Sequence, residues 1–303
     1  MSTRRTAYVQ LAGLMISAAL LAWAAPSGAQ EPTPGPALWR VSDADTTLYL
    51  FGLPHMMDAD TAWRTAAFDN ALEEADAVML EADRTSPEAQ ASLQQTVAQI
   101  GVYRDGRTLS ALLDEETRAQ AERVASALGV PMQGLDPLKP WLAANQLQSL
   151  MVQRAGLMNP QTPAAVITAE AAAEGMPVTY FEEPTTLLVA VGDLPEDSQL
   201  RLFKQALDII ETDPGQPQRI LSMWAEGDVE SLDEAFHGEG EWADETVRSA
   251  MLLERNALWQ ARIDEIMESE TGVYFAAVGV GHLVGEDSIV SGLDRGGYAI
   301  TRE

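Results

Sequence analysis

The order of strand-like and helix-like segments restricts this chain to few architectures. Short apolar runs, typical of buried strands, are separated by long segments with helical periodicity. The runs are Ala77–Leu80, Met176–Phe181 and Val273–Val278. Strands that alternate with helices usually form a largely parallel sheet with helices packed on its faces. The sequence therefore predicts an α/β fold with a central, largely parallel sheet.

Further strands are expected at both ends of this fold. Ala37–Val41 and Thr46–Phe51 flank the polar connection Ser42–Asp45, which suits a β-hairpin. The chain closes with a predicted helix from about Asp287 to Asp294 and a last strand, Tyr298–Thr301. We therefore expect an N-terminal hairpin at one edge of the sheet.

The remaining segments are mostly helical in pattern. Ala59–Ala75 and Ser198–Thr212 each predict one helix, and the apolar residues of the second form a single stripe. Residues 84–175 contain long Ala-, Leu- and Gln-rich stretches with helical periodicity. We expect these residues to form a mostly helical layer or insertion within one α/β domain that covers residues 37–303.

The N-terminus has the pattern of a secretory signal peptide. Two arginines precede the apolar stretch Leu11–Ala25, and small residues follow it at positions suited to a signal peptidase. The stretch is shorter than the ~20 residues of a spanning helix. We predict a cleaved signal peptide over residues 1–29, a Pro-rich linker over residues 30–36, and a periplasmic or secreted protein without stable membrane insertion. A retained membrane anchor is the alternative.

The composition excludes several kinds of function. Lys and Arg total 19 against 46 Asp and Glu, for a formal net charge of -27, so nucleic acid is not an expected partner. The chain has no cysteine, which excludes thiolate catalysis, disulfides and Cys-ligated zinc. Any catalysis must therefore use oxygen and imidazole groups.

Two of the three histidines share a local pattern. His55 ends the segment Gly52-Leu53-Pro54-His55, and His282 ends Gly279-Val280-Gly281-His282. Each segment follows a predicted strand, where a glycine permits a tight turn and close backbone approach. The two histidines are therefore expected just beyond the carboxyl edge of the sheet, where open α/β sheets bind ligands. His237 lacks this pattern and is not expected to act.

Two other predicted strands end in carboxylates, Glu81 and Glu182. If the strands are parallel, their carboxyl ends bring both glutamates near His55 and His282. Two imidazoles and two carboxylates suit a divalent metal ion, which lowers the pKa of bound water toward ~7. The alternatives are structural: Glu81 pairs with Arg84, and Glu182 caps the next helix.

Arg255 and Asn256 interrupt the apolar stripe of a predicted helix. A buried amide without a partner costs roughly 1–3 kcal/mol, so Asn256 must form a hydrogen bond. In the functional interpretation both residues point into the site, and Arg255 is a fixed cation that stabilises an oxyanion or orients Glu81 or Glu182. In the structural interpretation the pair ties this helix to a strand end.

The chain resembles the TraB/GumN family in several segments. They are Ala37–Asp43 leading to Leu48–Gly52, Leu138–Trp141, Glu254–Asn256 and Val278–Gly285. The resemblance covers nearly the whole predicted domain, and the paired Gly-x-x-His motifs are its most specific element.

This family includes the animal Tiki proteins. The resemblance implies an α/β fold akin to the haem-binding ChaN and erythromycin-esterase type, and metal-dependent peptidase activity such as some members have. In family terms, the paired histidines and Glu81 form the active centre.

The leading hypothesis is an exported, metal-dependent hydrolase that acts as a peptidase. A Mn, Co or Zn ion is expected on His55, His282 and Glu81, with Glu182 as ligand or base and with Arg255 and Asn256 in support. The expected partner is a peptide or small-molecule substrate. The alternatives are a non-catalytic envelope protein that binds haem, iron or a small ligand, and an accessory protein of polysaccharide production.

Overall fold

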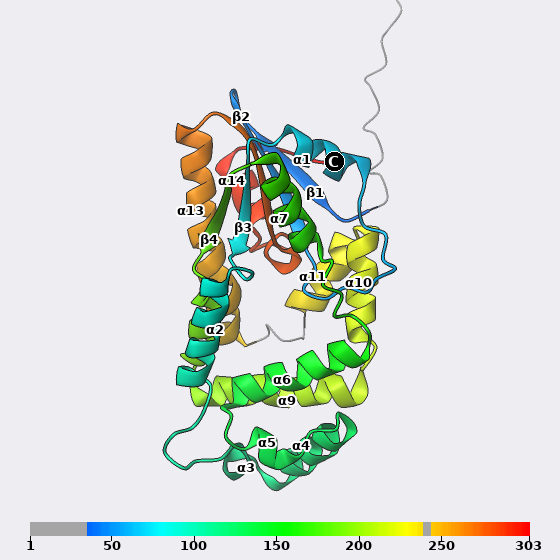
Figure 1. Cartoon of the computed structure of the whole chain (residues 1–303), viewed down its shortest axis with the longest axis vertical. Helices are drawn as coiled ribbons and strands as arrows, with labels where there is room; N and C mark the ends of the chain where they lie inside the picture. The colour runs from blue at the N-terminus through cyan, green and yellow to red at the C-terminus, as the bar shows by residue number, and fades with distance from the viewer. Residues whose placement is uncertain (1–34, 239–243) are drawn as a thin grey trace, which may run out of the picture. The chain divides into compact units, whose positions relative to one another are not determined.

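A mixed sheet of six strands organises the described residues, 35–238 and 244–303, of the computed structural model (Figure 1). The strand order is β4-β3-β5-β2-β1-β6. The strands are β1 (Leu38–Ser42), β2 (Thr46–Leu53), β3 (Ala77–Ala82), β4 (Val178–Glu182), β5 (Gly272–Gly279) and β6 (Ala299–Arg302). Neighbours from β4 to β2 are parallel, whereas β1 is antiparallel to both β2 and β6. The predicted α/β fold with a largely parallel sheet is confirmed.

The predicted hairpin is present, but it does not form the edge of the sheet. β1 and β2 pair from Leu38 with Phe51 to Ser42 with Thr47. The side chain of Asp43 accepts hydrogen bonds from the backbone N–H groups of Asp45 and Thr46, which stabilises the turn. β6 pairs with the outer side of β1, so the last strand of the chain covers the hairpin and becomes the edge.

Helices account for most of the chain between the strands. They are α1 (Ala66–Glu74), α2 (Pro87–Ile100), α3 (Leu109–Leu112), α4 (Glu115–Ala127), α5 (Met132–Leu135), α6 (Pro140–Arg154), α7 (Pro163–Glu174), α8 (Thr186–Gly192), α9 (Glu196–Thr212), α10 (Gln216–Glu226), α11 (Val229–His237), α12 (Glu245–Arg248), α13 (Glu254–Ser269) and α14 (Ile289–Gly296). A π-helical turn, Ser249–Leu253, joins α12 to α13, and a 3₁₀ turn, Val280–His282, follows β5.

Helix α1 begins later than the sequence pattern predicts. Its N-cap is Thr65, whose hydroxyl accepts a hydrogen bond from the N–H of Phe68. Upstream, the carboxylate of Asp58 accepts from the backbone of Asp60 and Thr61 and holds that segment in a turn. Competing side-chain hydrogen bonds of this kind favour turns over helix, which is why the predicted start at Ala59 is wrong.

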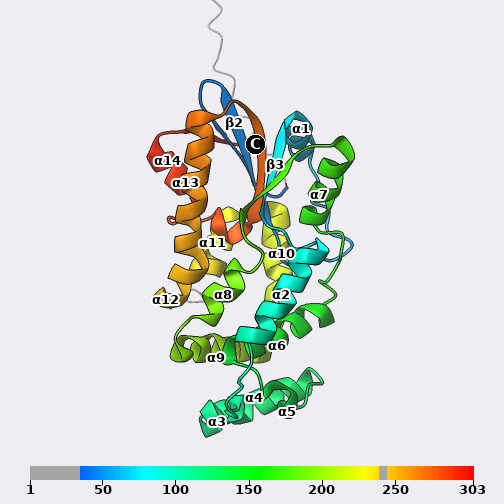
Figure 2. The ribbon, with the colours of Figure 1, turned by 60° about the vertical axis from the view of Figure 1, so that its left-hand side comes forward.

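The apolar residues form two main clusters. The larger one packs on the sheet, and the second joins α3, α4 and α6 to α9. Residues 84–175 are mostly helical, as predicted, but α9 follows β4 and still packs against α6 (Figures 1 and 2). The second cluster is therefore built from two segments that β4 separates in the sequence.

The described residues belong to one compact unit of the chain. In the part of the chain that the structure describes, no helix combines the length and apolar character needed to cross a bilayer. The predicted signal peptide, residues 1–29, and most of the predicted linker, residues 30–36, lie outside the described residues.

Candidate functional site

The carboxyl ends of the parallel strands bring the predicted site residues to one edge of the sheet. Leu53 at the end of β2 pairs with Gly279 at the end of β5. His55 and His282 lie just beyond these two ends, Glu81 lies near the end of β3, and Glu182 ends β4. Four chain segments far apart in sequence therefore meet here.

The two Gly-x-x-His segments fit into one another. A Cβ at Gly52 would lie 2.8 Å from Cγ2 of Val280, which belongs to the second segment. A Cβ at Gly279 would lie 2.8 Å from Nε2 of His55, in the first segment, and 3.4 Å from Oε2 of Glu81. Each glycine thus leaves space for a side chain of the other segment, which is the physical reason for the repeated pattern.

Arg255 uses all five of its N–H donors within the site. Nε and Nη2 donate to the two oxygens of Glu182, both at 2.9 Å, and Nη2 also donates to Oε1 of Glu81 at 2.7 Å. Nη1 donates to the carbonyl of Met251 at 2.8 Å and lies 3.1 Å from Nε2 of His282. The guanidinium therefore joins the ends of β3, β4 and β5 to α13.

Asn256 fixes the orientation of the buried His282 ring. Its Nδ2 donates to the carbonyl of Asp287 at 2.9 Å, so its Oδ1 faces Nδ1 of His282 at 2.6 Å. Because Oδ1 can only accept, we assign the proton of His282 to Nδ1. Nε2 is then the acceptor for Arg255, and both ring nitrogens have a partner. Asn256 thus acts on the site through His282.

Trp259 forms an aromatic wall that the sequence analysis missed as a site residue. Its ring centroid lies 4.4 Å from that of His282 and 5.5 Å from that of Phe181. Cζ of Arg255 lies 4.7 Å from the Trp259 ring centroid, a cation–π arrangement. The available signal was its spacing, because residues four apart on a helix face the same side.

The surroundings of the buried site favour an ionised Glu81 and a neutral His282, and they act in the opposite direction on Glu182. Burial opposes the ionisation of Glu81, but the positive charges of His55, when protonated, and of Arg255 outweigh it and lower the pKa of Glu81 to about 2. Burial, with Arg255 next to the ring, lowers the pKa of His282 to about 3. Burial raises the pKa of Glu182, although Arg255 opposes that rise.

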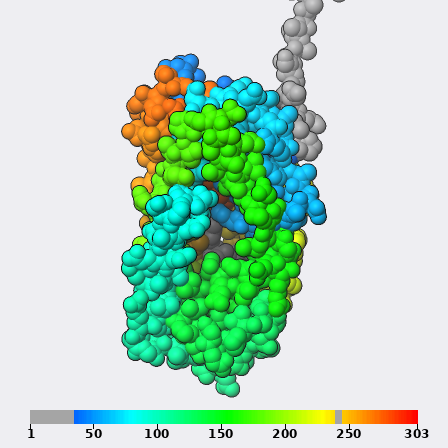
Figure 3. Space-filling model, in the orientation of Figure 1, coloured from blue at the N-terminus to red at the C-terminus, as the bar shows by residue number. Residues whose placement is uncertain are grey.

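His55 differs from the rest of the site because it is exposed to solvent. Surrounding protein nevertheless lowers the pKa of His55 by reducing hydration of the charged ring, while Glu81 raises it and Arg84 and Arg255 lower it further. The His55 side chain therefore lies in an open hollow, where it contacts solvent and is also surrounded by protein. Figure 3 shows a hollow in this face, bordered by the cyan atoms of α2 and green helical segments, where Figure 1 places the carboxyl ends of the strands.

The donor atoms do not fit the predicted metal site. Among residues 35–238 and 244–303, no group of three or more His, Asp or Glu side chains is placed to hold a metal ion. The predicted ligands were His55, His282 and Glu81. Nε2 of His282 and Oε1 of Glu81 instead accept hydrogen bonds from Arg255, which already places a positive charge between them.

The structural alternatives from the sequence analysis are partly present as well. Arg84 lies 3.3 Å from Oε1 of Glu81, so Glu81 has two arginine partners. His237 lies 2.5 Å from the carboxylate of Asp233, at the end of α11. The space at Gly285, three residues after His282, is also occupied by Asp233 and His237. His237 is therefore near the second Gly-x-x-His segment, which its own sequence context did not indicate.

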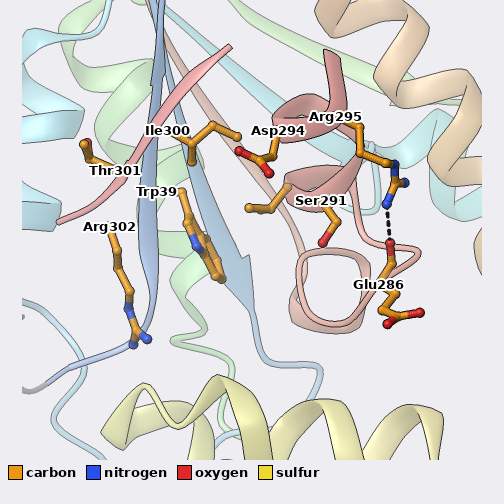
Figure 4. Close-up of a pocket in the computed structure, with 9 residues that line it drawn as sticks. Trp39, Glu286, Ser291, Asp294, Arg295, Ile300, Thr301 and Arg302 are labelled. Atoms are coloured by element: carbon orange, nitrogen blue, oxygen red, sulfur yellow. Dashed lines mark hydrogen bonds between the residues drawn. The ribbon is translucent and has the colours of Figure 1, made fainter. Parts of the chain in front are cut away.

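A separate cavity of about 540 Å³ lies between α14, β6 and β1 (Figure 4). Trp39, Ser291 and Arg302 contribute to its lining. Arg295 also lines it, and its guanidinium donates to the carbonyl of Glu286 at 2.9 Å. None of the predicted site residues lines this cavity.

Comparison with known proteins gives one match. A model of the TraB/PrgY/gumN family matches residues 37–302, nearly the whole of the predicted domain. Neither the curated proteins nor the solved structures include a match to this chain. Since the match spans both Gly-x-x-His segments and every residue of the site, the chain belongs to the TraB/PrgY/gumN family.

Proposed function

We propose that this protein is a hydrolase that cleaves amide bonds in peptides, with His55 as the group that activates water. The observation that carries the proposal is a solvent-exposed imidazole beside a buried, ionised carboxylate. Oε2 of Glu81 accepts a hydrogen bond from the N–H of Gly279 at 3.2 Å, and Oε1 accepts from Arg255. The carboxylate is thus fixed where Gly279 leaves room for the His55 ring.

The protonation states support this role for His55. Its lowered pKa keeps the ring neutral at neutral pH, so that it can accept a proton from water. The imidazolium that forms gains from the charge of Glu81, which raises the pKa of His55. A general base of this kind contributes typically 10²–10⁴-fold to a rate.

Arg255 acts in this proposal as a positioning residue. All five of its donors already have acceptors, so none is left for an oxyanion of the substrate. Of the two roles considered for it, the geometry favours orientation of Glu81 and Glu182. The same contacts tie α13 to the strand ends, so the functional and structural interpretations of Arg255 describe one arrangement.

A divalent metal ion is the other source of activated water that the sequence suggests. A Mn, Co or Zn ion on His55, His282 and Glu81 would compete with Arg255 for Nε2 of His282 and Oε1 of Glu81. The geometry therefore favours the metal-independent form of the proposal.

A turnover assay tests the proposal. The purified full chain is incubated with a peptide library in EDTA and, separately, with Mn, Co or Zn. We expect cleavage in EDTA, a loss of at least about 100-fold for His55→Gln, and retained cleavage for the matched control His237→Gln. Cleavage only with added metal would reject the metal-independent form. No cleavage under any condition would reject the hydrolase and favour the binding protein.

We also propose that the protein is exported to the periplasm or secreted. The support is the signal-like pattern of residues 1–29 together with a net charge of -27, which repels anionic lipid surfaces. Mass spectrometry of protein from the envelope fraction should find a chain that begins at Gln30. An intact N-terminus in that fraction would instead indicate a retained anchor.

A further inference from the structure

Strand β4 forms an open edge of the sheet next to the candidate site (Figure 1). It is the first strand in the order β4-β3-β5-β2-β1-β6, so among the described residues only β3 pairs with it. Thr179 and Tyr180, in the middle of β4, are exposed, Tyr180 by 40%. An open edge presents backbone N–H and C=O groups with which another extended chain can pair.

The pairing register identifies the backbone groups of β4 that face outward. The N–H of Val78 in β3 donates to the carbonyl of Pro177 at 2.9 Å, and Val78 lies opposite Val178. In a parallel pair, such a residue bonds to the two residues that flank its partner, so the backbone of Thr179 faces β3. Because this direction alternates along a strand, Val178 and Tyr180 direct their N–H and C=O groups away from the sheet.

The sequence of β4 lacks the residues that often block an edge strand. It reads Val-Thr-Tyr-Phe-Glu and contains neither Lys nor Pro. Helix α13 contacts the end of this strand, where Trp259 stacks on Phe181 and Arg255 binds Glu182. Tyr180 remains exposed beside these contacts. The middle of the edge is therefore accessible to a partner.

The strand leads directly to the candidate site. Its last residue, Glu182, is held by Arg255, and the His55 ring lies against Gly279 of β5. A strand added to β4 would lie three strand spacings, about 14 Å, from β5, a distance that about four extended residues span. A peptide paired with β4 would therefore reach His55 with the residues that follow its paired segment.

The charges around β4 favour a basic peptide. Residues 155–200 contain no Lys and no Arg. Glu174, before the strand, and Glu183, after it, are exposed. The formal net charge of the whole chain is -27. Attraction between opposite charges favours the approach of a basic peptide, whereas repulsion opposes pairing of β4 with a second copy of this acidic chain.

We propose that β4 binds a basic, extended peptide by strand addition, and that this peptide is the substrate. Outward N–H and C=O groups at strand spacing are complementary to the backbone of an extended polypeptide, and main-chain hydrogen bonds give such complexes their affinity. That the bound peptide is cleaved rests on the proposed function. The backbone pairing itself does not.

Strand addition can be measured without turnover. The full-length His55→Gln chain is labelled with ¹⁵N-tyrosine, and Tyr180→Val in the same background identifies the Tyr180 N–H resonance. The probe is the acetylated peptide amide Lys-Val-Lys-Val-Lys-Val, because β-branched residues favour strands and the lysines complement the acidic edge. We expect a saturable shift of the Tyr180 N–H resonance and slower exchange of its hydrogen with solvent. No shift at millimolar probe would overturn the proposal.

Methylation of the probe backbone tests the pairing pattern on the unmodified protein. Alternate N–H groups of a paired strand point toward its neighbour and away from it. The valine amides are therefore methylated in one probe and the lysine amides in another. One of the two should bind at least about tenfold more weakly than the unmethylated probe, and the other within about threefold. Equal binding of the two methylated probes would overturn strand addition.

Tyr180→Pro removes the outward N–H of β4 itself. Proline is tolerated in an edge strand where the N–H faces solvent, so the variant should fold, with an unchanged circular dichroism spectrum. Calorimetry should show about tenfold weaker binding of the unmethylated probe. Tyr180→Val removes the same ring but keeps the N–H, and it should restore most of that loss. Equal binding by the two variants would contradict pairing at Tyr180.

The outcomes also distinguish this inference from the proposed function. Alternating effects of methylation, without cleavage of any peptide by the unmodified chain, would support strand addition and reject only the hydrolase. Peptide cleavage that is insensitive to Tyr180→Pro would support the hydrolase and overturn strand addition. A dimer in sedimentation, with slow exchange of the Tyr180 N–H before any probe is added, would assign the edge to a second copy of the chain and overturn the peptide.

Discussion

The two Gly-x-x-His turns have the same sequence pattern and opposite environments. His282 is 4% exposed, and both of its ring nitrogens have partners in Arg255 and Asn256. His55, two residues beyond β2, is exposed to solvent. The glycines bring both turns together, whereas the neighbours of each ring decide what that ring can do. A shared motif therefore predicts proximity of the backbone and leaves the chemistry of each histidine open.

The largest expected effect comes from removing Arg255, whose hydrogen bonds hold the His282 turn in place. Arg255→Met leaves the carboxylates of Glu81 and Glu182 buried without their main partner. Breaking a buried ion pair in this way costs about 3–5 kcal/mol of unfolding free energy, which urea denaturation can measure. The matched control is Arg84→Met. Arg84 is 47% exposed, so we expect a loss of about 0–1 kcal/mol.

If both arginine variants were equally stable, the claim that Arg255 organises the buried half of the site would be wrong. If Arg255→Met folds and gains tight zinc binding, the arginine is what keeps His282 and Glu81 from acting as ligands.

The next substitution, Gly279→Ala, tests the contact between the two Gly-x-x-His turns. Gly279→Ala places a Cβ 2.8 Å from Nε2 of His55, so the ring must move. The backbone φ of Gly279 is -49°, which any residue adopts, so the effect is steric. We expect about tenfold or greater loss of peptide cleavage, because small misplacements of catalytic groups are costly. Kinetics of the variant measure it.

Gly134→Ala is the control for that substitution. The nearest atom to its added Cβ would be 3.8 Å away, an ordinary contact, and the site lies elsewhere. Activity should be unchanged. Equal activity of both alanine variants would contradict the interlocking of the two turns.

Much of this arrangement could be predicted from the sequence because it depends on strand order and on glycine. The alternation of segments predicts parallel strands, and their carboxyl ends bring together His55, Glu81, Glu182 and His282. The hydrogen bonds of Arg255 could not be predicted in the same way. A metal ion and a guanidinium both attract carboxylates and imidazoles, so the residue types fit either cation. Only the positions of individual donor atoms separate the two.

The buried His282 also makes the unfolding free energy depend on pH. In the unfolded chain His282 binds a proton below about pH 6.5, whereas in the folded protein its pKa is lowered to about 3. The unfolded state therefore binds more protons between these values, and the stability falls as the pH decreases through this window.

Well inside this pH window, His282 alone changes the unfolding free energy by about 1.4 kcal/mol per pH unit. Below about pH 4.5 the lowered pKa of Glu81 adds a loss of the same sign. Urea denaturation from pH 7 to 5 should show a shallower slope for His282→Gln than for the unmodified chain. Identical slopes would mean that His282 is not held neutral.

His282 is held as a neutral, hydrogen-bonded ring, whereas His55 stays open to solvent. Imidazole ¹⁵N and ¹³C NMR of the full chain, recorded between pH 8 and pH 5, tests it directly. We predict that the His282 ring keeps its proton on Nδ1 and does not titrate in this range, and that zinc leaves its signals unchanged. Titration of His282 near pH 6.5, or a zinc-induced shift of the His55 and His282 signals together, would mean that Arg255 and Asn256 do not hold the His282 ring neutral.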